Sequence, residues 1–211
     1  DLVRSRGLGD VYKRQFLFPA AGILVEKIFS MDAAWAFTVA ALLWVYLGIQ
    51  KGQVTQDGLT GLNNRRRLDQ YMWELDERSG ERETCCYLLM DVNKFKKVND
   101  TYGHVTGDEV LRLVAEQLKR TFGNMQAFLA RYGGDEFVVI VKGKTQDEMD
   151  VIIHQTQENV NAIAWGADTP WQLSISIGCA MRGEQGKQKS HELLALADER
   201  MYRQKKGIQD R

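Results

Sequence analysis

The turn at the centre of residues 130–141 constrains the fold of this chain more than any other feature. The stretch reads ARYGGDEFVVIV: Gly133 and Gly134 follow a short apolar run, Asp135 and Glu136 come next, and a second apolar run follows. Short apolar runs on both sides of a glycine pair predict a β-hairpin. Taken alone, two carboxylates at its tip fit a solvated turn better than a metal site, so the rest of the sequence must decide between these interpretations.

Hydrophobic periodicity predicts a sheet covered by helices. Short apolar or alternating runs predict strands, and apolar residues three and four positions apart predict helices. The expected strands cover residues 85–92, 127–132, 137–142 and 171–181, and the expected helices cover residues 65–77, 106–122, 145–165 and 190–206. Two of these helices carry the capping-box sequences TGDE and TQDE near their start.

Composition argues against some classes of function. The 28 basic and 28 acidic residues give a formal net charge of zero, and a protein that binds a nucleic-acid polymer usually carries a basic surface. The cysteines are odd in number, and Cys85 and Cys86 would point to opposite faces of one strand, so we expect reduced, buried, structural thiols in a cytosolic domain. The histidines are too scattered along the sequence to predict a zinc site.

Residues 1–15, DLVRSRGLGDVYKRQ, fit no periodic pattern. Their last six letters, DVYKRQ, resemble a translated transposase end from a sequencing library. We interpret this segment as an assembly artefact on a truncated gene, or as a disordered segment, and exclude it from the fold prediction. A natural basic flexible segment is the alternative.

Residues 16–50 predict transmembrane segments, the second at about residues 33–49. That second stretch, AAWAFTVAALLWVYLGI, contains no charged side chain, although a span usually needs about 20 predominantly apolar residues. Lys51 and the arginines at 65–67 follow it, so the positive-inside rule predicts an inner-membrane protein whose C-terminal part is cytoplasmic. A buried or dimer-forming helix of a soluble protein is the alternative.

Acidic residues predict a metal site in the C-terminal part. Asp91 ends the expected buried strand, where ligand crevices usually open. If this strand lies beside the hairpin, Asp91, Asp135 and Glu136 converge, and such a cluster repels itself unless a cation occupies it. Oxygen ligands without histidine or thiolate favour Mg²⁺ or Mn²⁺ over zinc.

The segment 91–108, DVNKFKKVNDTYGHVTGD, indicates nucleotide binding. Its lysines can neutralise phosphates, and Asn99 and Asp108 can hydrogen-bond to the edge of guanine. The glycines of the hairpin turn can adopt positive φ and let a phosphate approach the backbone. The alternatives are an ordinary solvated loop for the lysines and a first-turn helix residue for Asp108.

Five motifs in order resemble the GGDEF family of diguanylate cyclases. They are DGLTGLNNRR (57–66), DVNKFKKVNDTYGHVTGD (91–108), ARYGGDEF (130–137), SISIGCA (174–180) and ADERMY (197–202). The match covers residues 57–211, which follow a short polar linker at residues 51–56. The resemblance implies an α/β (α+β), palm-like nucleotidyl-cyclase domain with a central, mostly antiparallel sheet flanked by helices.

The resemblance also implies a function. In this family two GTP-loaded domains meet face to face as a homodimer and form the bacterial second messenger cyclic di-GMP, releasing two pyrophosphates. The implied metal is Mg²⁺ or Mn²⁺, and its matching ligands are Asp91, the backbone carbonyl of Val92, Asp135 and Glu136. Of these, Asp135 and Glu136 match catalytic positions. The matching substrate contacts are Lys96, Asn99, Asp108, Gly133, Gly134 and Lys205.

Three positions depart from the family pattern. Asn93 stands where the family often has Asp, and we expect little effect. The family's Arg-x-x-Asp product-inhibition motif falls on residues 124–127, which read NMQA, so we predict no strong feedback by product. The tail KKGIQDR lacks the usual Lys-x-x-Gly-Arg, which shifts or removes a second phosphate contact. The alternative function is a catalytically degenerate domain that only binds nucleotide and signals through contacts.

Overall fold

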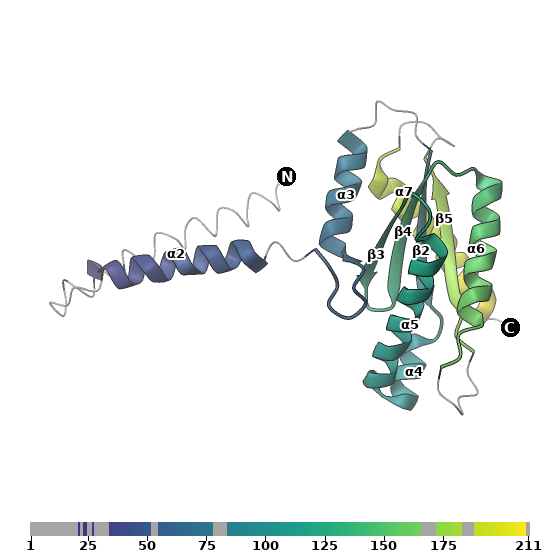
Figure 1. Ribbon diagram of the computed structural model, residues 1–211, viewed down its shortest axis with the longest axis horizontal. Coiled ribbons are helices and arrows are strands. Elements are labelled where there is room, and N and C mark those ends of the chain that lie inside the picture. The colour runs from purple at the N-terminus through teal and green to yellow at the C-terminus, as the bar shows by residue number, and fades with distance from the viewer. Residues whose placement is uncertain are drawn as a thin grey trace. The chain divides into compact units, whose positions relative to one another are not determined.

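The computed structural model describes residues 21, 23–24, 27, 34–51, 55–77, 84–165, 172–182 and 188–209. The chain divides into two compact units, Asp1–Val54 and Thr55–Arg211 (Figure 1). Residues 1–15, to which the artefact hypothesis applies, lie outside the described residues.

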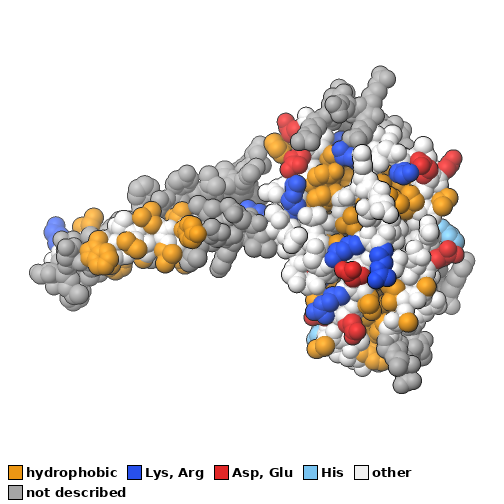
Figure 2. All heavy atoms as spheres, viewed as in Figure 1, with side chains coloured by type: hydrophobic (Ala, Val, Ile, Leu, Met, Phe, Trp, Pro, Cys, Tyr) orange, Lys and Arg blue, Asp and Glu red, His pale blue; other side chains and the backbone are white. Residues whose placement is uncertain are grey.

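The first unit contains helix α2 (Ala34–Lys51). Its hydrophobic side chains are largely exposed, among them Trp35, Leu42 and Trp44, and they form the orange surface along this helix in Figure 2. The prediction of a membrane span is wrong, because no helix in the described part of the chain combines the length and apolar character that crossing a bilayer requires. Helix α2 has 18 residues and ends in Gln50 and Lys51, which leaves its apolar part shorter than the usual span of about 20 residues. The inner-membrane localisation rested on that span and is corrected with it.

A five-stranded mixed sheet forms the centre of the second unit. Its strands are β1 (Asn63–Asn64), β2 (Cys85–Val92), β3 (Ala127–Gly133), β4 (Glu136–Lys142) and β5 (Ile175–Met181). Their spatial order is β1-β3-β4-β2-β5, and every pairing is antiparallel except that of the short β1 with β3. The α+β class and the largely antiparallel sheet agree with the prediction from sequence.

Helices cover both faces of this sheet (Figure 1). They are α3 (Arg65–Glu77), α4 (Phe95–Tyr102), α5 (His104–Phe122), α6 (Gln146–Asn161) and α7 (Ser190–Gln209). Strand β2 is buried at every position, so its side chains serve both layers: Leu88 and Met90 pack with α5 and α6, and Tyr87 and Leu89 pack with α3 and α7. Each such buried apolar side chain contributes roughly 1.5–3 kcal/mol. The three cysteines are buried, as predicted.

The expected helix at residues 106–122 begins two residues earlier, and a separate helix, α4, precedes it. The sequence TGDE is not a capping box, because Thr106 lies inside α5 and its hydroxyl donates to the carbonyl of Tyr102 (2.9 Å). The second capping box is confirmed: Thr145 and Glu148 exchange side-chain and backbone hydrogen bonds at the start of α6. That helix ends at Asn161, earlier than the expected residue 165.

Candidate active site

Asp91 lies at the carboxyl end of β2, between two other strands. In the antiparallel register it stands opposite Glu136 on β4 and opposite Ser176 on β5. Residues directly opposite each other point to the same face of a sheet, so the carboxylates of Asp91 and Glu136 share one face. The side chain of Asp91 is only 8% exposed. The buried strand β2 therefore places the Asp91 carboxylate where water has little access to it.

The glycine turn is joined to this end of β2. The backbone N–H of Val92 donates to the carbonyl of Asp135 (3.2 Å), and the β3–β4 register shifts by a bulge between Arg131 and Gly133. Gly134 has a φ of 51°, which a residue with a side chain rarely adopts. A Cβ built on either glycine of the turn would meet no atom within 4 Å, so open space lies beside the turn.

Carboxylates around this turn repel one another. Burial raises the pKa of Glu136 above its ordinary value, and the negative charges of Asp91, Asp135 and Asp198 raise it further. Burial likewise raises the pKa of Asp91, to which Asp135 adds, while Lys205 acts in the opposite direction. Both shifts have a physical cause, because burial and like charge disfavour the ionised form. Asp198, on α7, was not predicted as part of this cluster.

Lys205 forms an ion pair with Asp91. The resemblance implies that Lys205 contacts phosphate, which the structure does not test, and here its Nζ donates to Oδ1 of Asp91 at 2.6 Å. The two residues are 114 positions apart in the sequence, and α7 brings them together. The described residues contain no group of three His, Cys, Asp or Glu side chains arranged to hold a metal ion.

The donor set nevertheless fits a hard divalent cation. The negative charges of Asp91 and Asp135 lie near enough to Glu136 to add to the rise of its pKa that burial causes, and oxygen ligands of this kind suit Mg²⁺ or Mn²⁺. In this arrangement the cation beside Asp91 is the ammonium of Lys205.

The predicted guanine-reading residues lie on α4 and α5. Asn99 is half-buried on α4, and its Oδ1 is shielded from solvent and has no hydrogen-bond partner. A Cβ built on Gly107 of α5 would lie 1.9 Å from that oxygen, so Gly107 is needed for the position of Asn99. Asp108, the next residue, is exposed, and so is Lys96 on α4. An unpartnered buried amide oxygen is costly and suggests a missing donor.

Arg131 was not predicted as a site residue, yet it supports the turn. Its guanidinium donates to the carbonyl of Gly134 at 2.8 and 3.0 Å and to both oxygens of Asp57 at 3.2 Å. Although burial alone would raise the pKa of Asp57, hydrogen bonds from Thr60 and Arg131 lower it. The arginine of ARYGGDEF could have indicated this role from the sequence, but its partner Asp57 lies 74 residues away along the chain.

Asn93 has a larger structural role than predicted. Its Nδ2 donates to Oγ of Ser174 (3.0 Å), and its Oδ1 accepts from Oγ of Ser176 (2.7 Å), the residue opposite Asp91. Asn93 therefore fixes the end of β2 against β5. An aspartate at this position would keep the acceptor and lose the amide donor to Ser174.

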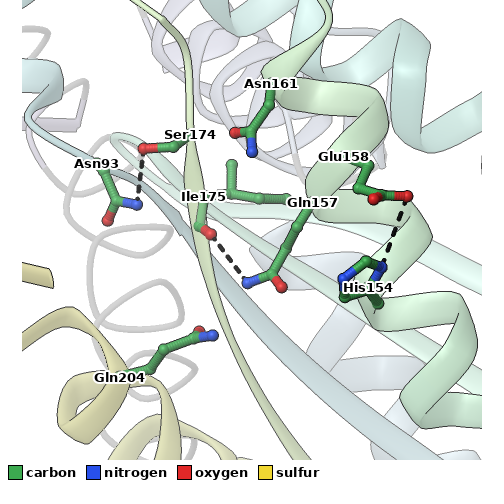
Figure 3. A pocket seen from close by; sticks show the side chains of 8 residues that line it. All are labelled: Asn93, His154, Gln157, Glu158, Asn161, Ser174, Ile175 and Gln204. Atoms are coloured by element: carbon green, nitrogen blue, oxygen red, sulfur yellow. Dashed lines mark hydrogen bonds and ion pairs between the residues drawn. The ribbon is translucent and has the colours of Figure 1, made fainter. Parts of the chain in front are cut away.

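A separate pocket of about 330 Å³ lies beside the start of β5 (Figure 3). Its lining residues are Asn93, His154, Gln157, Glu158, Asn161, Ser174, Ile175 and Gln204. In Figure 3 the amide of Gln157 donates to the carbonyl of Ile175 (3.3 Å) and His154 pairs with Glu158. None of these lining residues is a lysine or arginine, so the pocket does not suit a triphosphate. It contains no residue of the predicted site.

Known proteins share this fold. The family model described as diguanylate cyclase, GGDEF domain, matches residues 54–211. The chain belongs to the GGDEF diguanylate cyclase family.

Two curated relatives and one solved structure illustrate the similarity. The probable diguanylate cyclase DgcI of Escherichia coli (strain K12) is 38% identical over 156 residues, which cover 72% of this chain and 31% of that protein. The probable diguanylate cyclase DgcC of the same strain is 32% identical over 160 residues, covering 74% of this chain and 42% of that protein. The GGDEF domain of DgcB from Caulobacter crescentus, solved in complex with c-di-GMP, is 30% identical with a TM-score of 0.65, covering 74% of this chain and 92% of that one. The chain thus spans less than half the length of these two curated relatives.

Proposed function

We propose that this chain is a diguanylate cyclase of bacterial second-messenger signalling, which joins two GTP molecules into cyclic di-GMP and releases two pyrophosphates. Family membership supports this activity. The observation that carries it is the convergence of Asp91, Asp135 and Glu136 at the end of β2, beside an open glycine turn. We assign the activity to residues 57–211. A degenerate binding module is not favoured, because the GGDEF sequence is intact and both Asp91 and Asp108 are present.

The proposed nucleotide site extends from the helices to the turn. The unpartnered Oδ1 of Asn99 supports this proposal and would accept an N–H of guanine, and the exposed carboxylate of Asp108 would accept a second. Two such contacts discriminate guanine from adenine, because adenine offers no donor at its N1 position. The open space at Gly133 and Gly134 would admit the phosphates. Lys96 and Lys205 are the proposed cationic contacts to them.

The proposed metal ligands are the carboxylates of Asp91 and Asp135 and the backbone carbonyl of Val92, with Glu136 in support. Bound there, Mg²⁺ or Mn²⁺ would lower the pKa of the attacking 3′-hydroxyl and offset negative charge at the α-phosphorus. Asp135, held to the end of β2 through its carbonyl, is the proposed acceptor of the hydroxyl proton.

The reaction needs two copies of the chain. The 3′-oxygen of one GTP forms a bond to the α-phosphorus of the other, the bond to the bridging oxygen breaks, and pyrophosphate leaves. In a second, equivalent step the 3′-oxygen of the other GTP forms a bond to the remaining α-phosphorus, the second pyrophosphate leaves, and the ring closes. Because each domain has one such site, we propose that the active species is a homodimer. We also propose that product does not inhibit through an Arg-x-x-Asp motif, since residues 124–127 carry no charge.

Product analysis tests the proposal. The chain is incubated with GTP and Mg²⁺, and the products are separated by chromatography and identified by mass. We expect cyclic di-GMP and two equivalents of pyrophosphate, with no cyclic product from ATP. Chain that is folded and saturated with GTP and Mg²⁺ but forms no cyclic di-GMP would contradict the proposed activity.

A further inference from the structure

Helix α7 lies directly against the edge strand β5, and this contact fixes where its C-terminal turns end. A Cβ built on Gly178 of β5 would lie 1.9 Å from the carbonyl oxygen of Ala197 and 2.4 Å from the backbone nitrogen of Met201. Only glycine therefore lets the helix backbone approach this closely. The packing of α7 on β5 is set by backbone atoms and leaves little freedom to slide.

Two side chains of α7 hydrogen-bond to the backbone of β5 and hold this placement. Oε1 of Gln204 accepts from the backbone N–H of Ile177 (2.7 Å), and Arg200 donates to the carbonyl of Cys179 (2.6 Å). Since β5 is an edge strand, these hydrogen bonds give partners to backbone groups that the sheet itself leaves unpaired. Lys205 follows Gln204 directly, so its position beside β2 is a consequence of this registration.

The Lys205 side chain is held at its backbone end by α7 and at its ammonium end by Asp91. Its Nζ lies 2.6 Å from Oδ1 of Asp91, and its side chain is 28% exposed while that of Asp91 is 8% exposed. A buried carboxylate without a partner is strongly destabilising, so this ammonium satisfies a requirement of the fold. A lysine has a flexible four-carbon stem and three donors, so the same group can move to another anion near it.

We propose that Lys205 is the counter-ion of Asp91 in the metal-free protein and thereby makes metal binding depend on nucleotide binding. This inference rests on the proposed function for the identity of the metal and the nucleotide. A divalent cation that enters alone competes with the ammonium for the same carboxylate. When a triphosphate enters with it, the ammonium has a new anionic partner, and Asp91 is released to the metal.

Linkage makes this dependence reciprocal. If the Lys205 ammonium moves from Asp91 to the triphosphate and this helps the metal to bind, then metal binding must strengthen nucleotide binding by the same factor. Removing the ammonium should therefore change the two affinities in opposite directions. Metal alone should bind more tightly, because no competing cation remains, and nucleotide should bind more weakly, because a phosphate contact is lost. A lysine that only contacts phosphate would leave the affinity for metal alone unchanged.

The neighbouring Lys206 provides a matched control. It is exposed, it carries the same charge on the same helix, and its Nζ lies over the ring of Tyr202, 4.8 Å from the centroid. Lys206→Met removes one positive charge from the same end of α7 without touching Asp91. Any effect of overall charge on metal binding is therefore common to both variants.

The experiment measures Mn²⁺ binding to the full chain by electron paramagnetic resonance, without nucleotide and with a non-reactive GTP analogue. For Lys205→Met we expect Mn²⁺ alone to bind roughly fivefold or more tightly than to the wild type, and the gain from nucleotide to shrink by a similar factor. Lys206→Met should match the wild type, Lys205→Arg should retain the coupling, and Asp91→Asn should weaken Mn²⁺ binding in every background. Circular dichroism establishes that each variant is folded, and Lys205→Gln replaces Lys205→Met if the latter is not.

Mn²⁺ affinity without nucleotide that is unchanged or weaker in the folded Lys205 variant would overturn this proposal. The same holds if Lys206→Met reproduces the effect. Because Mn²⁺ binding is read without turnover, the outcome is separate from that of the proposed function. A chain that makes no cyclic di-GMP can still show the coupling, and an active cyclase can lack it.

Discussion

Largely buried charges lie at both ends of strand β2, but the two ends differ in how those charges are compensated. Near its start, the carboxylate of Asp76 pairs with Arg182 and accepts from the backbone N–H (3.1 Å) and the hydroxyl (2.7 Å) of Ser190. Near its finish, the cation that pairs with Asp91 in the described part of the chain is Lys205. At that second end the further carboxylates are Asp135, Glu136 and Asp198.

This difference separates a structural cluster from a binding site. The Asp76 cluster joins α3, the turn residue Arg182 that follows β5, and the start of α7, with one acid and one base. Tyr87 adds a neutral hydroxyl, because burial raises its pKa to about 12. Among the described residues, the Asp91 cluster brings the carboxylates of Asp91, Asp135, Glu136 and Asp198 together near the ammonium of Lys205. Because like charges disfavour the ionised form, we interpret this cluster as a proposed site for a ligand that supplies positive charge. Both glycines of the neighbouring turn have open space beside them, which agrees with this interpretation.

The largest expected effect lies at the under-compensated end. Asp135→Ala and Glu136→Ala should each abolish measurable turnover of GTP, a loss beyond about 10²-fold, because the charge that holds the metal is removed. The melting temperature should stay the same or rise, because one repelling carboxylate is gone. Turnover assays and thermal melts check the two parts. Variants that keep cyclase activity would remove our assignment of the site.

The opposite pattern is expected at the compensated end. Arg182→Met should lower the free energy of unfolding by about 3 kcal/mol, because it leaves the carboxylate of Asp76 largely buried without its cation. Activity per folded molecule should persist. Chemical denaturation measures the loss, and Arg203→Met is the control, since the Arg203–Glu199 pair is mostly exposed and should contribute less than about 1 kcal/mol. Equal losses in the two variants would show that the Asp76 cluster is not structural.

A third prediction concerns the guanine-reading side chain. Gly107→Ala places a methyl group where Oδ1 of Asn99 now lies, so the amide must move. We expect KM for GTP to rise by about tenfold, the loss of one good hydrogen bond, with a smaller preference for GTP over ATP. Steady-state kinetics and nucleotide competition measure both. If KM and base preference are unchanged in folded protein, Asn99 does not read the base.

The smallest expected effect is at Asp57, whose hydrogen bonds support the turn through Arg131. Its pKa is lowered in the folded protein, so the stabilisation is fully present above its ordinary pKa of 3.8 and is lost as pH falls through the lowered value. Asp57→Asn should therefore cost about 1 kcal/mol at neutral pH, and the difference from wild type should vanish in acid. Denaturation curves at several pH values check this. A difference that grows toward low pH contradicts the sign.

Local patterns were sufficient to predict the carboxylate cluster and most of the elements around it. A buried strand that ends in Asp91 and a glycine turn with two acids are visible within short windows. Residue-level periodicity also located the core helices. The membrane span was wrong because freedom from charge does not by itself give enough apolar length.

Other features depend on contacts that no short window contains. Helix α4 begins at Phe95, and the preceding N-cap residue, Lys94, is in a left-handed conformation (φ 58°) without a side-chain cap, so the usual start signal is missing. The two-residue strand β1 has no periodicity to detect. The pairing of Lys205 with Asp91 requires α7 to pack on Gly178, which only the folded backbone reveals.

Mixing wild-type chain with Asp135→Ala chain tests the central claim most directly. At fixed total concentration and saturating GTP and Mg²⁺, the initial rate of cyclic di-GMP formation is measured as the wild-type fraction falls. If each of the two phosphodiester bonds needs the turn carboxylates of a different copy, only pairs of wild-type chains complete the ring. The rate should then fall as the square of the wild-type fraction. A rate that falls in direct proportion, or that does not fall, would contradict the account.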